Sequence, residues 1–177
     1  MNDSPRHDIA LLDAIDTAGK AFSGNVWRIV RKGRDPLKGS TLNGRWSGGD
    51  FSVLYTSCEC DGALAEVGFR LSLEPIWPSR IEHVLCEISV ECSKVLDLRE
   101  LGTLARLGVD VERYRSLDYT VTSKIAAAAS FLEFDAILVP CARFSCKNLV
   151  IFNERPNQIE IVSSNPVDWD KWRSRQK

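Results

Sequence analysis

Apolar and polar residues alternate along this chain with two different periods. A period near two is typical of strands and a period near 3.6 of helices. Strands are predicted at residues 26–30, 53–56, 81–90, 95–98, 136–139, 149–152 and 158–162. Helices are predicted at residues 9–18, 61–71, 99–107, 118–131 and 167–173, with Asp61 as the cap of the second and an alanine run favouring the fourth.

The order of these elements predicts a single α+β domain. The strands are too unevenly spaced for a doubly wound parallel sheet, and the chain has no G-x-G-x-x-G motif. A mixed, mostly antiparallel sheet with flanking helices follows. Residues 136–139 and 149–152 are apolar throughout, so both faces of these strands are expected to be buried. At 177 residues and 44% hydrophobic, the chain can bury one substantial core.

Charge and hydropathy narrow the classes of partner. The net charge of -1 creates no overall field that would attract nucleic acid or an anionic membrane. No run approaches the roughly 18 apolar residues that a spanning helix needs. The first ten residues contain Asp3, Pro5 and Asp8 where a signal peptide would be basic and then apolar. We therefore expect a cytoplasmic protein with no direct nucleic-acid or membrane partner.

The cysteine and histidine positions do not predict a metal site. Cys58 and Cys60 form a C-x-C pair, whereas the other four of the six cysteines are scattered, and the chain has only two histidines. None of these residues has the spacing of a zinc ribbon or a redox motif. Reduced thiols and no bound metal are the expectation.

Three positions deserve a chemical interpretation. Gly44-Arg45-Trp46 lies near the end of a polar, glycine-rich stretch at residues 32–50, and loops of that length are usually functional. Tyr55 lies in a short apolar strand. Glu66 lies among small and apolar residues, where partial desolvation would tune a carboxylate for catalysis.

Each of these residues also has an ordinary structural interpretation. Arg45 fits a solvated loop, and Tyr55 fits a half-buried strand aromatic. Glu66 can pair with Arg70 one helical turn later, an interaction worth only about 0.2–0.5 kcal/mol. Composition and periodicity alone predict no more than an α+β domain with an anion-binding loop.

The residues around these positions resemble the RES domain, a family named for a recurring arginine, glutamate and serine. The resemblance covers residues 26–150, about two-thirds of the chain, and its specificity lies in the order and intervals of its short motifs. These are Val26-Trp-Arg28, Asn43-Gly-Arg-Trp46, Val53-Leu-Tyr-Thr-Ser57, Ala63-Leu-Ala-Glu66, Val139-Pro-Cys-Ala142 and Asn148-Leu-Val150.

The resemblance implies a bacterial toxin with a fold related to ADP-ribosyltransferases. Members of the family degrade NAD at the nicotinamide–ribose bond by hydrolysis or phosphorolysis, with NAD as substrate and without metal or cofactor. The matched motifs imply Arg45, Tyr55 and Glu66 as catalytic residues. Substrate-binding positions implied in the same motifs are Arg28, Trp46, Cys141 and Asn148. Glu66 would stabilise an electron-poor ribosyl cation, and it could help deprotonate the nucleophile. Tyr55 would stack on nicotinamide, and Arg45 and Arg28 would bind the pyrophosphate.

Cys141 departs from the family pattern, because it occupies the position of the serine. A thiol is a weaker hydrogen-bond donor than a hydroxyl, so activity could be weakened or redirected. Ser145 is an alternative source of the hydroxyl. A third alternative makes Cys141 a nucleophile, but no histidine base is near it in the sequence.

The resemblance also implies a partner and a division of the chain. Family toxins are neutralised by a helix-turn-helix (Xre-type) antitoxin, and a homodimer within that complex is compatible with the family. We expect a helical segment at residues 1–25, the RES domain at residues 26–163 and a helical extension at residues 164–177. The tryptophans of that extension, Trp169 and Trp172, are expected to close the core, with a dimer or antitoxin interface as the alternative.

Two alternatives to an NAD-degrading toxin are left open by the sequence. The same residues could transfer ADP-ribose to a protein. The domain could also be a binding module whose chemistry has been lost, a loss that Cys141 would reflect. A Glu66→Gln change that leaves toxicity intact would favour the binding module.

Overall fold

Six strands and five α-helices make up the computed structural model, which describes residues 7–155 and 158–176. The strands are β1 (Lys20–Arg31), β2 (Val53–Ser57), β3 (His83–Asp97), β4 (Ala136–Pro140), β5 (Lys147–Phe152) and β6 (Gln158–Pro166). The helices are α1 (Ile9–Ala14), α2 (Cys60–Ser72), α3 (Leu101–Arg106), α4 (Thr120–Phe131) and α5 (Trp169–Ser174), with a 3-10 turn at Val111–Arg113.

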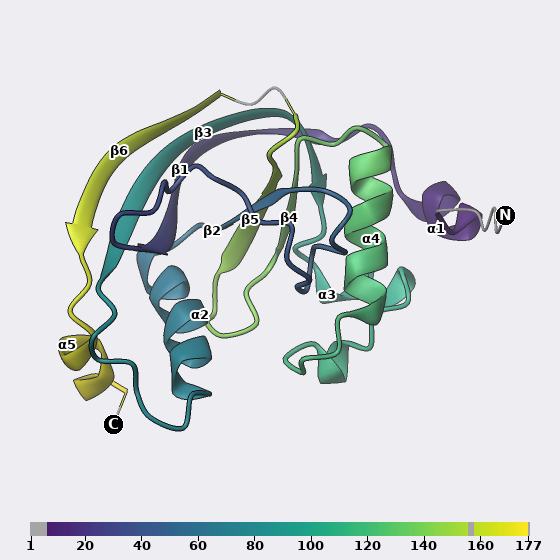
Figure 1. Cartoon of the computed structure of the whole chain (residues 1–177). Coiled ribbons are helices and arrows are strands. Elements are labelled where there is room, and N and C mark those ends of the chain that lie inside the picture. Colours follow the sequence, from purple (N-terminus) through teal and green to yellow (C-terminus); the bar gives the residue numbers. More distant parts are fainter. Residues whose placement is uncertain (1–6, 156–157, 177) are drawn as a thin grey trace, which may run out of the picture.

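The sheet has the order β1-β2-β5-β4-β3-β6, and β1 also pairs with β3. Because β1 touches β2 at Trp27 and Ser57 and runs along most of β3, five strands close into a ring and β6 extends it. β1, β3 and β6 arch together over the molecule (Figure 1). Only β3 and β4 are parallel. The predicted α+β class with a mostly antiparallel sheet is confirmed.

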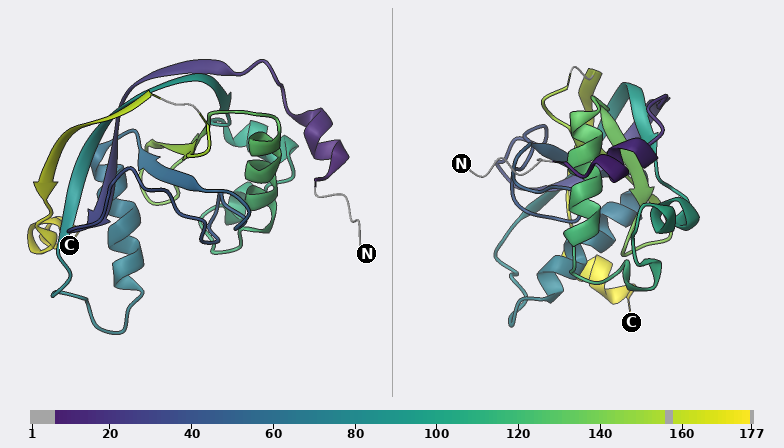
Figure 2. Two further views of the ribbon diagram at one scale, coloured as in Figure 1. Left: turned by 45° about the horizontal axis from the view of Figure 1, so that its top comes forward. Right: turned by 90° about the vertical axis from the view of Figure 1, so that its right-hand side faces the viewer.

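Apolar side chains fill both sides of the central strands. On β5, Leu149 and Ile151 point into the strand ring, whereas Val150 and Phe152 point into a second core beneath α4. The alternation follows from the period-two geometry of a strand. Figure 2 shows α4 along one side of the strands and α1 beyond it, on the side opposite to β6 and α5. Burial of β4 and β5 on both faces is therefore confirmed.

β3 differs from its prediction, because the two strands expected at residues 81–90 and 95–98 are one strand. The register between β1 and β3 shifts in a bulge opposite Lys20 and Phe22. At this bulge the carboxylate of Asp135 accepts hydrogen bonds from the backbone N–H groups of Ser93 and Lys94, each at 2.8 Å. Asp135, which lies 41 residues after Lys94 in the sequence, thus accepts from the two N–H groups that the bulge leaves without a partner strand.

Three other boundaries are also corrected. β1 begins at Lys20, so the end of the segment expected to be helical, residues 1–25, is strand. The first six residues of that segment lie outside the described residues. α2 begins at Cys60 after the N-cap residue Glu59, which makes no side-chain capping bond, so Asp61 lies in the first turn and is not the cap. β6 continues to Pro166, past the expected start of the C-terminal extension.

The C-terminal helix α5 packs onto the rest of the domain through its tryptophans. Trp169 is buried, and its indole N–H donates to Nδ1 of His83 at 3.0 Å. Trp172 packs on Gly68 of α2 so closely that an added Cβ would lie 2.3 Å from the ring. The burial of Trp169 agrees with the expectation that it closes the core, whereas Trp172 is half-buried and its role stays a prediction. Among residues 7–155 and 158–176, no helix is both long and apolar enough to cross a membrane.

Candidate active site

A cleft of about 420 Å³ opens between β1, β2, α2, the stretch that precedes β2 and the segment before α4. Figure 1 shows the β4–β5 turn beside α2. The lining includes six of the seven residues implied by the family motifs, namely Arg28, Arg45, Trp46, Tyr55, Glu66 and Asn148. Residues from five separate segments are thus brought into one site.

A second hollow, of about 550 Å³, lies between α2 and α5. It is larger and more open, but none of the implied site residues lines it. Its walls are mainly aromatic and apolar, including Phe69, Trp77 and Trp172, and Glu74 is its only carboxylate. The chemistry therefore belongs to the smaller cleft.

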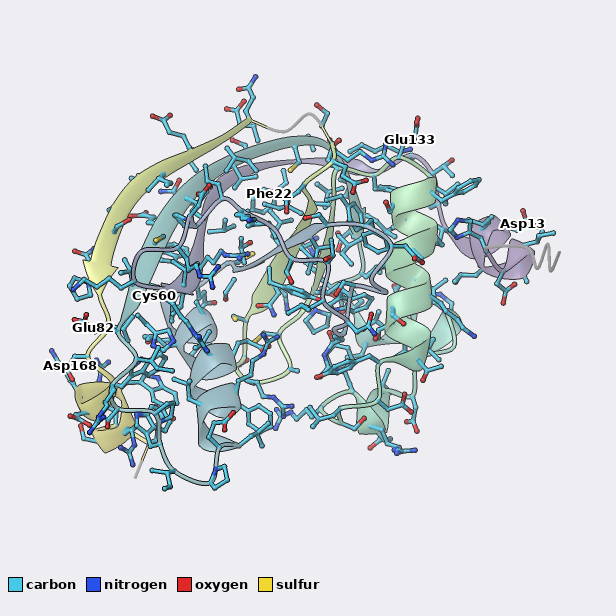
Figure 3. All side chains as sticks on the ribbon, viewed as in Figure 1. Asp13, Phe22, Cys60, Glu82, Glu133 and Asp168 are labelled. Atoms are coloured by element: carbon cyan, nitrogen blue, oxygen red, sulfur yellow. The ribbon has the colours of Figure 1, made fainter. Side chains whose placement is uncertain are left out.

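Glu66 is held by three hydrogen bonds, all to the same oxygen. Oε1 accepts from the thiol of Cys141 at 3.2 Å, from the backbone N–H of Ala142 at 3.3 Å and from the side-chain amide of Asn148 at 3.3 Å. Helix α2 begins close against the strands, since a Cβ on Gly62 would lie 2.3 Å from the hydroxyl oxygen of Ser57. Figure 3 labels Cys60 in the first turn of this helix. The ion pair with Arg70 is not formed. Oε1 is thus fixed, and Oε2 has no hydrogen-bond partner among the residues that the structure describes.

Cys141 donates its thiol proton to the carboxylate of Glu66. The neighbouring thiol of Cys146, together with burial and the nearby carboxylate of Glu66, raises the pKa of Cys141 above its ordinary value. A thiol that holds its proton is a poor nucleophile but remains a donor to Glu66. Ser145 is exposed and makes no hydrogen bond to Glu66. The structure therefore places Cys141, and not Ser145, at the carboxylate.

Tyr55 fastens the loop that carries the arginine. Its hydroxyl accepts from the backbone N–H of Trp46 at 3.0 Å and shares a hydrogen bond with the hydroxyl of Ser47 at 3.1 Å. Ser47 in turn donates to the carbonyl of Leu42 at 2.6 Å. Burial raises the pKa of Tyr55, so this hydroxyl keeps its proton. The ring of Tyr55 lines the cleft while its hydroxyl is used by the loop.

Arg45 is engaged with another segment of the protein. Its guanidinium donates to the backbone carbonyls of Tyr114 and, at 3.1 Å, Ser116. Its Cζ also lies 4.9 Å from the ring centroids of both Tyr114 and Tyr119, a cation–π distance. These contacts give Arg45 a clear structural task, because they hold the segment before α4 against the cleft.

Trp46 does not offer its ring to a ligand, contrary to the expectation that it binds substrate. Its side chain is 2% exposed and packs in the core beneath α4. The indole also hydrogen-bonds the hydroxyl of Tyr114, which itself donates to the carbonyl of Pro140 at 2.7 Å. Trp46 therefore supports the cleft from behind.

Two buried polar atoms at the cleft have no hydrogen-bond partner in the described structure, Nε of Arg28 and Oδ1 of Asn148. The other nitrogens of Arg28 donate to the carbonyls of Lys38 at 3.1 Å and Tyr55 at 3.4 Å. Burial lowers the pKa of Arg28. Such unpaired atoms are rare in folded proteins and mark places where a bound molecule or water completes the bonding.

Two further arginines, Arg70 and Arg143, line the cleft and were not found from the sequence, because neither lies in a motif. Four arginines therefore face one glutamate. Arg143 lies 3.5 Å above the ring of Phe69 and donates to the carbonyl of Arg115 at 2.9 Å. This excess of positive charge suits an anionic ligand with several phosphate oxygens. Within residues 7–155 and 158–176, no three His, Cys, Asp or Glu side chains gather where a metal ion could be held.

Comparison with known proteins identifies the family of this chain. The family model of the RES domain matches residues 25–170. The chain belongs to the RES domain family. A relative from Mycobacterium tuberculosis named "Probable NAD(+) phosphorylase Rv3189" is 32% identical over 169 residues, covering 88% of this chain and 80% of the relative.

A solved structure shows the same fold. It is a chain in the crystal structure of the M. tuberculosis MbcT-MbcA toxin-antitoxin complex, with a TM-score of 0.80 and 22% identity. The match covers 94% of this chain and 97% of that chain. The relation to ADP-ribosyltransferases stays a prediction.

Proposed function

We propose that this RES-domain protein degrades NAD by cleaving the bond between nicotinamide and ribose. The observation that carries the proposal is the carboxylate of Glu66, fixed through Oε1 by three donors inside a cleft with four arginines. The name of the 32% identical relative supports the same substrate.

Glu66 stabilises the positive charge that develops on the ribose. As the bond breaks, its electron pair leaves with nicotinamide, and the ribosyl carbon becomes electron-poor. The negative charge of Glu66 is already in place and needs no reorganisation during the reaction, which is the condition for effective electrostatic catalysis. The donors on Oε1 fix the orientation of the carboxylate and leave Oε2 for a ribose hydroxyl or the incoming nucleophile.

The arginines share the work of binding the pyrophosphate. Arg28, with an unpaired Nε, and the cleft-lining Arg70 and Arg143 supply its donors. Arg45 has both terminal nitrogens engaged with backbone carbonyls, so it holds the cleft wall and adds its charge to the site. The ring of Tyr55 stacks against nicotinamide and orients the bond that breaks.

The acceptor is inorganic phosphate, with water as the slower alternative. A phosphate oxygen that attacks the ribosyl carbon needs no base, whereas water must lose a proton to a group such as Glu66. The arginine excess suits a second anion beside the pyrophosphate of NAD. Nicotinamide release from NAD by the pure protein, measured with and without phosphate, tests both the cleavage of NAD and phosphate as the acceptor. The remaining alternative is transfer of ADP-ribose to a protein. With labelled NAD in a cell lysate, this reaction would leave labelled ADP-ribose on protein.

The partner is a helix-turn-helix (Xre-type) antitoxin that covers the cleft. The fold shared with a chain of a toxin-antitoxin complex supports a partner of this class. NAD is consumed inside the cell, so the proposed activity places the protein in the cytoplasm. Expression alone should arrest growth, the antitoxin should restore it, and Glu66→Gln should remove the toxicity. A homodimer within the complex is tested by the mass of the purified assembly.

A further inference from the structure

Cys141 and Cys146 face each other across the turn that joins β4 and β5. The ladder between these strands pairs Pro140 with Lys147, so the two cysteines occupy the next facing positions. The backbone N–H of Cys141 donates to the carbonyl of Cys146 at 3.0 Å, which continues the ladder by one step. The two thiols lie near enough for each to shift the pKa of the other.

This placement fits the geometry of a disulfide. Facing residues at a hydrogen-bonded position of an antiparallel ladder have Cα atoms about 5.5 Å apart. Disulfides join Cα atoms about 4.4–6.8 Å apart. The two side chains can therefore be linked without moving the strands. All six cysteines of the chain are free thiols in this structure.

The surroundings make the two thiols unequal. The neighbouring thiol of Cys141 and the hydroxyl of Ser57, which lies 3.5 Å from the sulfur of Cys146, lower the pKa of Cys146. The first turn of α2 lies against it, since a Cβ on Gly62 would be 2.4 Å from its sulfur. The positive end of a helix favours a thiolate there. Cys146 is thus the reactive thiol, and Cys141, which keeps its proton, is the thiol that resolves the first product.

We propose that Cys141 and Cys146 form an oxidisable dithiol beside the cleft, which a peroxide converts into a disulfide. The thiolate of Cys146 attacks one peroxide oxygen, the other oxygen leaves as hydroxide, and a sulfenic acid forms. The sulfur of Cys141 then displaces the hydroxyl group of that sulfenic acid, which leaves as water. The two thiols lose two electrons and two protons, and hydrogen peroxide is reduced to two waters.

The disulfide changes the site because the thiol of Cys141 donates to Glu66 at 3.2 Å. In the oxidised protein this proton is gone, and the sulfur turns toward Cys146. Glu66 Oε1 then keeps two of its three donors. Loss of one hydrogen bond to a charged group predicts a fall in activity of about tenfold, reversed by a dithiol reductant. This consequence rests on the proposed function, whereas formation of the disulfide does not.

Trypsin cleaves between the two cysteines, which makes the disulfide directly measurable. Cleavage at Lys124, Arg143 and Lys147 releases peptides 125–143 and 144–147, each with one cysteine of the pair. The whole protein is treated with hydrogen peroxide, its free thiols are alkylated, and the tryptic peptides are analysed by mass spectrometry. We expect the two peptides joined and two mass units lighter than their sum, and separated again after reduction.

Variants separate this pair from the other thiols. Cys146→Ser should give no linked peptide and no reversible loss of nicotinamide release, and Cys58→Ser is the matched control that should still give both. Absence of the linked peptide from peroxide-treated wild type overturns the proposal, as does a link that joins Cys146 to Cys58. A linked peptide with unchanged activity overturns its effect on the site. If no form of the protein releases nicotinamide, the proposed function fails while the peptide still decides the disulfide.

Discussion

The hydroxyl of Tyr55 is expected to stabilise the fold through the loop that carries Arg45. Trp46 donates its backbone N–H to this hydroxyl, and the hydroxyl donates onward to Ser47, whose own proton goes to the carbonyl of Leu42. A Tyr55→Phe change keeps the ring in the cleft and removes only this link. The N–H of Trp46 is then left in a buried position without its partner.

The size of the effect follows from the two hydrogen bonds. A buried donor left unpaired costs about 1–3 kcal/mol, and an ordinary lost bond adds about 1 kcal/mol. We expect Tyr55→Phe to lower the free energy of unfolding by about 2–4 kcal/mol, measured in urea. For a domain of this size that corresponds to a midpoint temperature lower by roughly 4–16 °C. Nicotinamide release should keep a near-normal KM if the ring stacks on the substrate.

Ser47→Ala provides the matched control, because it removes the second link of the same chain and leaves the N–H of Trp46 bonded. It should lower stability by about 1 kcal/mol. The double variant should lose less than the sum of the two single losses, since both act on one network. An unfolding free energy of Tyr55→Phe within about 0.5 kcal/mol of wild type, or strictly additive losses, would refute the reasoning.

Two further predictions concern the seating of α5. Gly68→Ala should destabilise the protein by about 1 kcal/mol, because its Cβ would clash with the Trp172 ring. The control Gly102→Ala in α3, where an added Cβ has nothing within 4 Å, should stabilise the protein by about 0.5–1 kcal/mol. Equal effects of the two changes on thermal unfolding would contradict this. Burial lowers the pKa of His83, whose neutral ring accepts from Trp169, so stability should be complete above about pH 6.5 and be lost as the pH falls below it. His83→Phe should remove this pH dependence. If the unfolding free energies of wild type and His83→Phe change equally between pH 5 and pH 8, the prediction is wrong.

The strands beside the site could be predicted because their signal is local. β4 and the last four residues of β5, residues 149–152, are apolar throughout, and a strand so composed is expected to be covered on both faces. Glu66 stood out for the same reason, as the only charged residue in a run of small and apolar ones. In both cases the residues near in sequence carry the information.

The remainder depends on residues far apart in sequence. The carbonyls and rings that hold Arg45 come from Tyr114 and its neighbours, 69 or more residues later. The bulge in β3 exists because Asp135 satisfies its donors. A hydrophobic pattern does not contain either contact, so the contacts of Arg45 with these carbonyls were not predicted and β3 was expected as two strands. Trp46 was misplaced likewise, since its motif does not show which face of the loop is buried.

The central claim is that Glu66 drives cleavage of NAD. Glu66→Gln keeps an oxygen at Oε1 for its three donors, so the unfolding free energy should stay within about 2 kcal/mol of wild type, because a neutral acceptor binds more weakly than a charged one. The most direct measurement is nicotinamide release from NAD by the pure wild type and Glu66→Gln, with and without phosphate. The account predicts release by wild type that phosphate accelerates, and a rate about 100- to 1,000-fold lower for Glu66→Gln. Release by Glu66→Gln at the wild-type rate, or no release by folded wild type under either condition, would contradict it.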